Sequence, residues 1–304
     1  MNQQVAEEIR RRLLAAGACA VGFAPAGPVE PRAVEAFDRW LAAGNQGALS
    51  YMERNRELRL DPRGLLDGCH TVVSTAWLYN PRELRDPALP YLARYAYCRD
   101  YHNALRSVLK PLMRQVEADF GYSWRICIDS APVMERYWAV KSGIGFCGRS
   151  GLLIVPGVGS RVFLAEVLLA GGDSLPGQAS QDNQTTLCDS CDRCVRACPG
   201  NALTLPSPDC RRCLSALTIE VPGSAARVPR TTLMGCDVCQ DVCPYNREDK
   251  KGNVAALATL PHLLKVSAEE LRHLTDADFR TRYAGTPLMR VGLAGLLHNL
   301  QTPS

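Results

Sequence analysis

Apolar residues recur in the first part of the chain in two patterns, one typical of helices and one typical of buried strands. The segments that have the amphipathic spacing of a helix and end at a glycine are 5–17, 101–121 and 132–143. The apolar runs that predict strands are 18–25, 71–78 and 123–132. These patterns predict that helices and strands alternate in this region.

The pattern changes beyond residue 150. Residues 151–171 hold two apolar runs and predict a β-hairpin that turns around Pro156 to Gly159. Residues 171–186 are polar and glycine-rich, which indicates a linker or surface crossing into the cysteine-rich part that follows. Helical periodicity returns over 263–285. Apart from two cysteine runs, we find no internal repeat.

Composition places the chain among ordinary globular proteins. Its 304 residues are 46% hydrophobic and 22% charged, enough for one large domain or two modest ones. The net charge of +4 permits an anionic partner but does not require one. The N-terminus lacks the apolar core of a signal peptide, and no uncharged apolar run reaches about 18 residues. We therefore expect a cytoplasmic protein with no membrane association.

The 14 cysteines change this picture, because a long chain without a secretion signal uses many cysteines for metal or redox chemistry. The first run has the spacing C-x2-C-x2-C-x3-C-P and consists of Cys188, Cys191, Cys194 and Cys198. This is the bacterial ferredoxin spacing, in which the fourth cysteine binds the other cluster. Zinc is the main rival, but a zinc knuckle does not need the third and fourth cysteines at these positions.

The second run, C-x2-C-x3-C-P, has no leading cysteine. It consists of Cys236, Cys239 and Cys243. If the last cysteines of the two runs are exchanged, as in two-cluster ferredoxins, the first cluster takes Cys188, Cys191, Cys194 and Cys243. The second takes Cys198, Cys236, Cys239 and either Cys210 or Cys213. Two [4Fe-4S] clusters carry electrons, so the 187 residues before Cys188 must hold something that consumes them.

Five separated blocks resemble the epoxyqueuosine reductase family. They include "ARYAYCRDYHNALRSVLKPL", "CIDSAPVMERYWAVKSGIGFCGRSGLLIVPGVGSRVFLAEVLL", "RRCLSALTIE" and "GTPLMRVGLAGLLHN", together with the two cysteine runs, in order over about residues 5–300. The resemblance implies a cobalamin-dependent, iron–sulfur reductase that completes queuosine synthesis in tRNA. It also implies that Cys213, just before Leu214 and Ser215, is the eighth cluster ligand, and that Cys210 is an additional thiol.

The resemblance implies an α+β fold: a nitroreductase-like, cobalamin-binding α/β domain followed by a bacterial two-cluster ferredoxin-like domain. We expect the first domain over 1–175, the second over 176–255 and a C-terminal helical segment over 256–304. Longer members of the family add C-terminal helical repeats, which are not expected in a chain that stops at Ser304. The expected partners are the anticodon stem-loop of tRNA and a low-potential donor such as flavodoxin or ferredoxin. We expect a monomer.

The resemblance assigns Asp129, in "CIDSAP", as the proton donor to the departing epoxide oxygen. Read without the family, Asp129 or Ser130 could instead cap the helix that follows. As an acid near neutral pH, Asp129 would need its pKa raised by burial beside the corrin and the substrate. The other residues expected around the cofactor are Arg59, Tyr101, His102, Arg136, Arg149 and Ser215, with the three arginines suited to amide and phosphate edges or to RNA. His102 is not expected to ligate cobalt.

Two alternatives remain open from the sequence. A reductive dehalogenase would also combine a corrinoid with two clusters, but such enzymes are typically exported and longer. A non-catalytic electron-transfer protein would use residues 1–187 only to dock a partner. Cobalamin absorbance in the purified protein would exclude the plain carrier, and activity on tRNA but not on aryl halides would exclude the dehalogenase.

Overall fold

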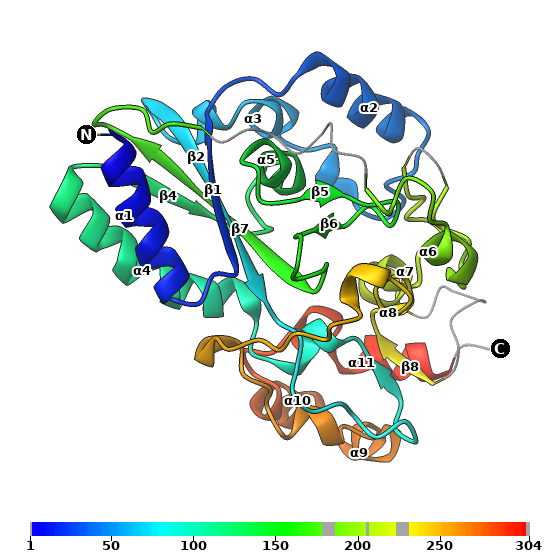
Figure 1. Ribbon diagram of the computed structural model, residues 1–304. Helices are drawn as coiled ribbons and strands as arrows, with labels where there is room; N and C mark the ends of the chain where they lie inside the picture. The colour runs from blue at the N-terminus through cyan, green and yellow to red at the C-terminus, as the bar shows by residue number, and fades with distance from the viewer. Residues whose placement is uncertain (1, 178–185, 205–206, 223–230, 302–304) are drawn as a thin grey trace.

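The computed structural model describes residues 2–177, 186–204, 207–222 and 231–301. Its main feature is a four-stranded antiparallel sheet with the strand order β1-β2-β7-β4 (Figure 1). The strands are β1 (Ala20–Pro25), β2 (Cys69–Leu78), β4 (Ser123–Cys127) and β7 (Val162–Ala170). The three strands predicted before residue 150 are therefore confirmed, within a few residues at their ends.

Helices cover both faces of this sheet (Figure 1). On one face lie α1 (Asn2–Ala15) and α4 (Tyr101–Phe120), and on the other lie α2 (Pro31–Ala42), α3 (Arg56–Leu60) and α5 (Glu135–Lys141). Because side chains alternate along a strand, Val167 and Leu169 of β7 pack in the core with Leu109 of α4. The intervening Leu168 packs in a separate core with Trp138 of α5. The predicted helices are confirmed, and α4 ends at Gly121, which adopts a left-handed conformation.

The predicted hairpin over 151–171 is wrong. β6 (Leu153–Ile154) pairs with β5 (Phe146–Cys147) and not with β7. The reason is that β7 lies inside the sheet, where β2 and β4 occupy both of its edges. The chain does reverse near the predicted turn, where Val155 and Gly159 form an isolated antiparallel bridge. A side chain at Gly159 would collide with Asn246, since its Cβ would lie 2.1 Å from the Asn246 Oδ1.

The second half of the described chain is built from short elements. Its helices are α6 (Arg193–Ala197), α7 (Leu214–Glu220), α8 (Val238–Asp241), α9 (Ala268–His273), α10 (Asp276–Arg282) and α11 (Leu288–Gln301). Short 3-10 helices are found at Ser50–Met52, Pro62–Leu65, Arg94–Tyr97, Pro244–Asn246, Ala255–Leu257 and Leu263–Lys265. The helical prediction for 263–285 is confirmed. The helical region is divided into α9 and α10, because Thr275 caps the start of α10 through a capping box with Asp278.

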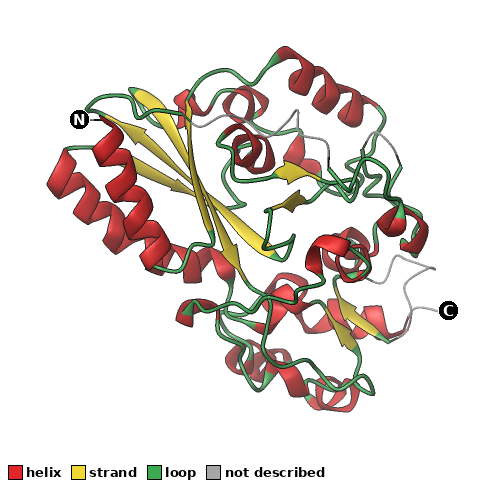
Figure 2. Ribbon diagram, in the orientation of Figure 1, coloured by secondary structure: helices red, strands yellow, loops and turns green. Residues whose placement is uncertain are grey.

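A second apolar core lies away from the sheet. Here β3 (Tyr91–Leu92) pairs in parallel with β8 (Thr232–Met234), and both pack against the C-terminal helices. Leu92, Met234, Phe279 and Leu296 are all buried in this core. It therefore joins three parts of the chain that are far apart in sequence, and the division into three consecutive domains stays a prediction. Figure 2 shows the resulting mixture of helices, one larger sheet and two small ones.

No helix in the described residues is both long enough and apolar enough to cross a membrane. Half of the predicted linker, residues 178–185, lies outside the described part of the chain.

Candidate active site and iron–sulfur centres

Asp129 lies in the loop that follows β4, and its backbone is in the left-handed region with φ of 51°. Non-glycine residues in this region are uncommon and gather at functional sites. Neither Asp129 nor Ser130 caps the next helix, because α5 begins at Glu135 and its cap position is Met134. The Ser130 hydroxyl donates instead to the Ile128 carbonyl. The helix-capping alternative is therefore wrong.

Two residues at the start of α4 bind the Asp129 carboxylate. His102 Nε2 lies 3.1 Å from Asp129 Oδ2, and His102 Nδ1 lies 3.1 Å from Asp100 Oδ1. Tyr101 also hydrogen-bonds to Asp129 and stacks between His102 and Phe163, with ring centroids 4.2 and 4.3 Å away. The His102 imidazole is thus held between the carboxylates of Asp100 and Asp129. The Asp129 side chain remains accessible to a ligand, since 60% of its surface is exposed.

In this structure Asp129 is a carboxylate and His102 is protonated, whereas a carboxylic acid donor would require a protonated Asp129. Hydrogen bonds to Asp100 and then to Asp129 raise the pKa of His102 to about 9. Desolvation acts to raise the pKa of Asp129, but the hydrogen bonds from His102 and Tyr101 outweigh it and lower that pKa. At neutral pH the proton therefore lies on His102, in its hydrogen bond to Asp129. The rise in the Asp129 pKa expected beside a bound corrin and substrate stays a prediction.

Two buried acids next to Asp129 were missed from the sequence. Glu135 Oε1 accepts a hydrogen bond from the Asp129 backbone N–H at 2.5 Å. Burial, and then the charge of Asp129, raises the pKa of Glu135 to about 8. Glu166 lies within β7 with 0% of its surface exposed, and neither of its carboxylate oxygens has a partner among the described residues. A glutamate inside the apolar run "VFLAEVLLA" is the signal that could have revealed the second acid.

Arg59 is also placed near these acids. It lies at the end of α3, is buried, and forms no ion pair within the described part of the chain. Its Nη2 donates to the Tyr51 carbonyl at 3.2 Å, while its Nε has no partner among the described residues. The negative charges that act on it include those of Glu135 and Asp129. A buried guanidinium that keeps a free donor is suited to a polar ligand.

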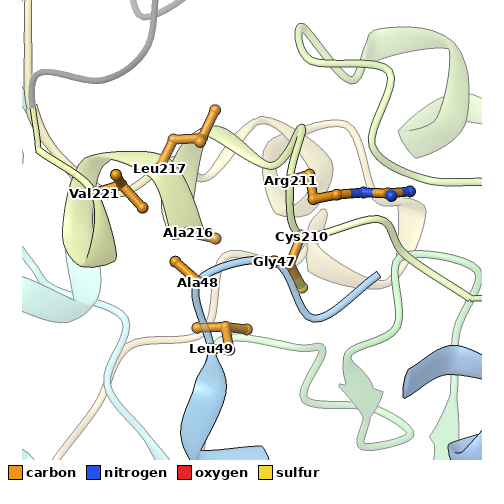
Figure 3. A pocket seen from close by; sticks show the side chains of 8 residues that line it. All are labelled: Gly47, Ala48, Leu49, Cys210, Arg211, Ala216, Leu217 and Val221. Carbon is orange, nitrogen blue, oxygen red and sulfur yellow. The ribbon is translucent and has the colours of Figure 1, made fainter. Parts of the chain in front are cut away.

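A pocket opens between the loop 47–49 and α7 (Figure 3). Its volume is about 230 Å³, and it is lined by Gly47, Ala48, Leu49, Cys210, Arg211, Ala216, Leu217 and Val221. Next to this lining in the chain, Gln46 Oε1 is buried and has no partner among the described residues. Tyr51 lies near both the pocket and Asp129. Burial, and then the charges of Glu220, Asp129 and Cys210, raise the pKa of its phenol.

Among the other predicted residues, Ser215 lies in the first turn of α7 but outside the pocket lining. Arg136 donates to the Gly151 carbonyl. The walls of the pocket are mostly small and apolar. The place of the expected corrinoid stays a prediction.

The cluster cysteines fall into two groups. Besides burial, the charges of Cys188 and Cys243 raise the pKa of Cys194, and those of Cys188 and Cys191 raise the pKa of Cys243. These four thiols therefore lie near one another, and all four line one small pocket together with Cys239. This is the grouping expected from exchanging the last cysteines of the two runs.

The second group contains Cys213. Burial and then the charges of neighbouring thiolates raise the pKa of Cys236 to about 11, with Cys213 and Cys198 among those neighbours. Burial, and then the charges of Cys236 and Cys213, raise the pKa of Cys239 to about 12. Cys213 lies immediately before α7, whereas Cys210 lines the pocket described above. Cys213 therefore lies near Cys236 and Cys239, and also near Cys210, so its choice as the eighth ligand stays a prediction.

Backbone N–H groups point at the thiols of both groups. The Arg149 N–H lies 3.2 Å from Cys188 Sγ, and the Ala202 N–H lies 3.2 Å from Cys198 Sγ. Hydrogen bonds to sulfur stabilise the thiolate form and tune cluster potentials. The Arg149 guanidinium donates to the Asp189 carbonyl at 2.9 Å, so Arg149 lies beside the first thiol group. No three acidic, cysteine or histidine side chains in the described chain converge on one metal ion. A cubane instead binds each thiolate at a separate iron.

Comparisons with known proteins agree with this geometry. Residues 59–130 match the family described as "Epoxyqueuosine reductase QueG, DUF1730", and residues 187–246 match a 4Fe-4S double cluster binding domain. The epoxyqueuosine reductase of Gloeobacter violaceus is 35% identical over 309 residues, covering 98% of this chain and 95% of the relative.

The chain belongs to the epoxyqueuosine reductase family. Two solved structures of such reductases align with 98% of this chain, and each alignment covers 80% of the solved chain. One, bound to a tRNA-Tyr stem-loop modified with epoxyqueuosine, has a TM-score of 0.82 and is 25% identical. The other, from Bacillus subtilis, has a TM-score of 0.83 and 24% identity, and its catalytic aspartate loop is swung out of the active site. Family membership confirms the mixed α+β fold with a two-cluster, ferredoxin-like part.

Proposed function

We propose that this chain reduces epoxyqueuosine to queuosine at the wobble position of tRNA. The observation that carries the proposal is the similarity to named epoxyqueuosine reductases over 98% of the chain, at 35% identity. The geometry adds a proton-holding pair, Asp129 and His102, in a chain that also groups eight cysteines into two sets of four. A reaction that needs both electrons and protons requires both features.

The clusters would be two [4Fe-4S] cubanes. Cys188, Cys191, Cys194 and Cys243 would bind one, and Cys198, Cys213, Cys236 and Cys239 would bind the other. Both sets have the local N–H donors that support reduced clusters. Electrons would enter from a low-potential donor such as flavodoxin or ferredoxin and pass through the two clusters.

Cobalamin would lie between the Asp129 loop and α7. Arg59, Tyr101, Arg136, Arg149 and Ser215 would surround it, and Arg59 would use its unpartnered Nε as a donor. When bound, cobalamin supplies a low-potential cobalt that acts as a nucleophile toward the epoxide. The protein's own residues then have to position the substrate and control its protons.

Asp129 would deliver the proton that the departing oxygen requires. In the resting site this proton lies on His102 and is shared with Asp129 through the 3.1 Å hydrogen bond. Asp100 holds the opposite imidazole nitrogen and so keeps Nε2 directed at Asp129. As negative charge develops on the substrate oxygen, the proton can pass from His102 through Asp129. Asp129 remains accessible for this contact, since 60% of its side-chain surface is exposed.

The RNA partner would be the anticodon stem-loop carrying epoxyqueuosine. A relative has been solved with such a stem-loop, and single-stranded loops present unstacked bases that proteins can recognise. The modest net charge of +4 favours a small, salt-sensitive contact with the RNA backbone. We expect the protein to act as a monomer.

The function is tested by anaerobic reconstitution with iron, sulfide and cobalamin, followed by incubation with reductant and a stem-loop carrying epoxyqueuosine. Mass analysis of the wobble nucleoside should show the loss of one oxygen. A protein that holds both clusters and cobalamin, yet leaves the nucleoside unchanged, would contradict the proposed function. Unmodified stem-loop and enzyme without reductant are the controls.

A further inference from the structure

The stoichiometry of the reaction leaves one proton without a source. Removing an epoxide oxygen to leave an alkene and water consumes two electrons and two protons. In the proposed function the electrons come through the clusters, and the imidazolium of His102 supplies one proton through Asp129. Asp129 itself is already a carboxylate, because its hydrogen bonds lower its pKa. A second proton has to reach Asp129, either from solvent or from a group in contact with it.

Glu135 is in direct contact with Asp129. Its Oε1 accepts the backbone N–H of Asp129 at 2.5 Å, across the turn that gives Asp129 its left-handed φ of 51°. Among the charged groups that act on Glu135, the Asp129 carboxylate acts most strongly. Glu135 can thus hold the Asp129 loop in place and respond to the charge on Asp129.

Glu166 is a second acid in the interior near Glu135. It lies on β7, against which α5 packs, and the Glu135 charge acts on it. Both Glu166 oxygens are buried without a partner among the described residues, and an unpartnered carboxylate there is strongly disfavoured. Burial therefore keeps Glu166 protonated, its pKa being well above the usual range. The interior behind Asp129 holds two neutral carboxylic acids.

Charged and titratable groups face Glu135 from each element packed around it. They are Asp129 on the loop, His102 and Tyr101 on α4, Arg59 on α3, Cys127 on β4, Glu166 on β7 and Arg136 on α5 itself. Arg136 and His102 favour the carboxylate form. Burial and Asp129 outweigh them, so the pKa of Glu135 is raised to about 8.

We propose that Glu135 is a positioning residue that stores the second proton of the reduction and passes it to Asp129. The first proton goes from His102 through Asp129 to the substrate oxygen. The O–H bond of Glu135 then breaks as an O–H bond forms on Asp129, and Asp129 gives this proton to the oxygen as it leaves as water. Glu135 remains as a carboxylate and takes up a proton from solvent before the next turnover. This inference rests on the proposed function.

The test compares Glu135→Gln with Glu166→Gln in the reconstituted holoenzyme. The amide oxygen introduced by Glu135→Gln can still accept the Asp129 N–H, so the substitution removes the proton and keeps the hydrogen bond. Glu166→Gln is the control, because it replaces a nearby acid whose pKa is also raised but that has no hydrogen bond to Asp129. Turnover of Glu135→Gln should fall by about two orders of magnitude, the low end for positioned acid catalysis. Glu166→Gln should stay within about threefold of wild type.

The pH profile and infrared spectra separate proton storage from a structural role. Wild-type turnover should begin to fall near pH 8, where Glu135 ionises, whereas Glu135→Gln should fall only near pH 9, where His102 does. Infrared difference spectra of wild type should show a carboxylic acid band that disappears across about pH 8 and is absent from Glu135→Gln. Equal rates for the two variants, or no such band in wild type, would overturn the inference. If wild type fails to convert the nucleoside, the proposed function fails, while the infrared titration still decides whether Glu135 holds a proton.

Discussion

The cluster region and the acid site are assembled in opposite ways. The first cluster group would draw three of its four thiols from one short run, Cys188 to Cys194, and the second would draw two from the run that starts at Cys236. The acid site combines side chains from the start of α4, the loop after β4 and the start of α5. The first is encoded by local spacing, whereas the second exists only once the sheet and its helices have formed.

This difference indicates how the two regions should respond to substitution. A cluster needs every one of its ligands, so the loss of one thiolate should remove a whole function. The acid site is a chain of hydrogen-bonded groups, so the effects of substitution should decrease with distance from the substrate oxygen. The following predictions test this contrast, from the largest effect to the smallest.

Cys213→Ala should abolish turnover, because it removes the eighth ligand and with it one of two clusters. The purified variant should contain about half of the iron and sulfide of wild type. Cys210→Ala is the matched control, since Cys210 is only three residues away but lines the pocket next to α7. Iron and sulfide analysis with electron paramagnetic resonance would check this. Loss of iron from Cys210→Ala and not from Cys213→Ala would show that the two cysteines have been assigned the wrong way round.

Asp129→Asn should lower turnover by roughly two to four orders of magnitude, the usual contribution of a positioned acid. The amide keeps the shape of the side chain but cannot relay the proton of His102. Iron and cobalamin contents should remain at the wild-type level, because no cluster thiol contacts Asp129. Ser130→Ala, one residue away, is the control and should be close to wild type. Near-equal rates for Asp129→Asn and wild type would remove Asp129 from the mechanism.

His102→Gln should have a smaller effect, lowering turnover by about tenfold to a hundredfold, because Asp129 can still take a proton from solvent. The pKa of His102 is raised from 6.5 to about 9, so protonated His102 stabilises the fold fully below pH 6.5. That stabilisation is lost as the pH rises through about 9. The thermal midpoint of wild type should therefore decline over this range more than that of His102→Gln. Parallel curves for the two proteins would contradict the raised pKa.

The same contrast explains how much could be predicted from the sequence. The cysteine spacings indicated two clusters, and glycine stops placed the end of α4 at Gly121. The choice of Cys213 needed the family resemblance, because spacing alone left Cys210 equally possible. The strands of the sheet were predicted, but the pairing of β7 was not, since its neighbours β2 and β4 come from distant parts of the chain.

For the acid site, the sequence and its family resemblance pointed to Asp129 and its surroundings but not to its hydrogen-bond partners. His102 lies 27 residues before Asp129, and nothing in the local sequence indicates that their side chains meet at 3.1 Å. Asp100, which was not singled out from the sequence, both caps α4 and holds His102 Nδ1. The lowered pKa of Asp129 follows from these non-local contacts and could not be predicted from burial alone.

The central claim is that electrons from the clusters and protons from the Asp129 site are consumed together at one epoxide. It is tested most directly by a single turnover of pre-reduced, cobalamin-loaded enzyme with a limiting amount of stem-loop carrying epoxyqueuosine. Cluster oxidation is followed by absorbance, and the nucleoside is analysed in the same sample. We predict two electrons lost per queuosine formed in wild type, and neither cluster oxidation nor queuosine on the same timescale in Asp129→Asn. Cluster oxidation in Asp129→Asn at the wild-type rate, without queuosine, would contradict this coupling.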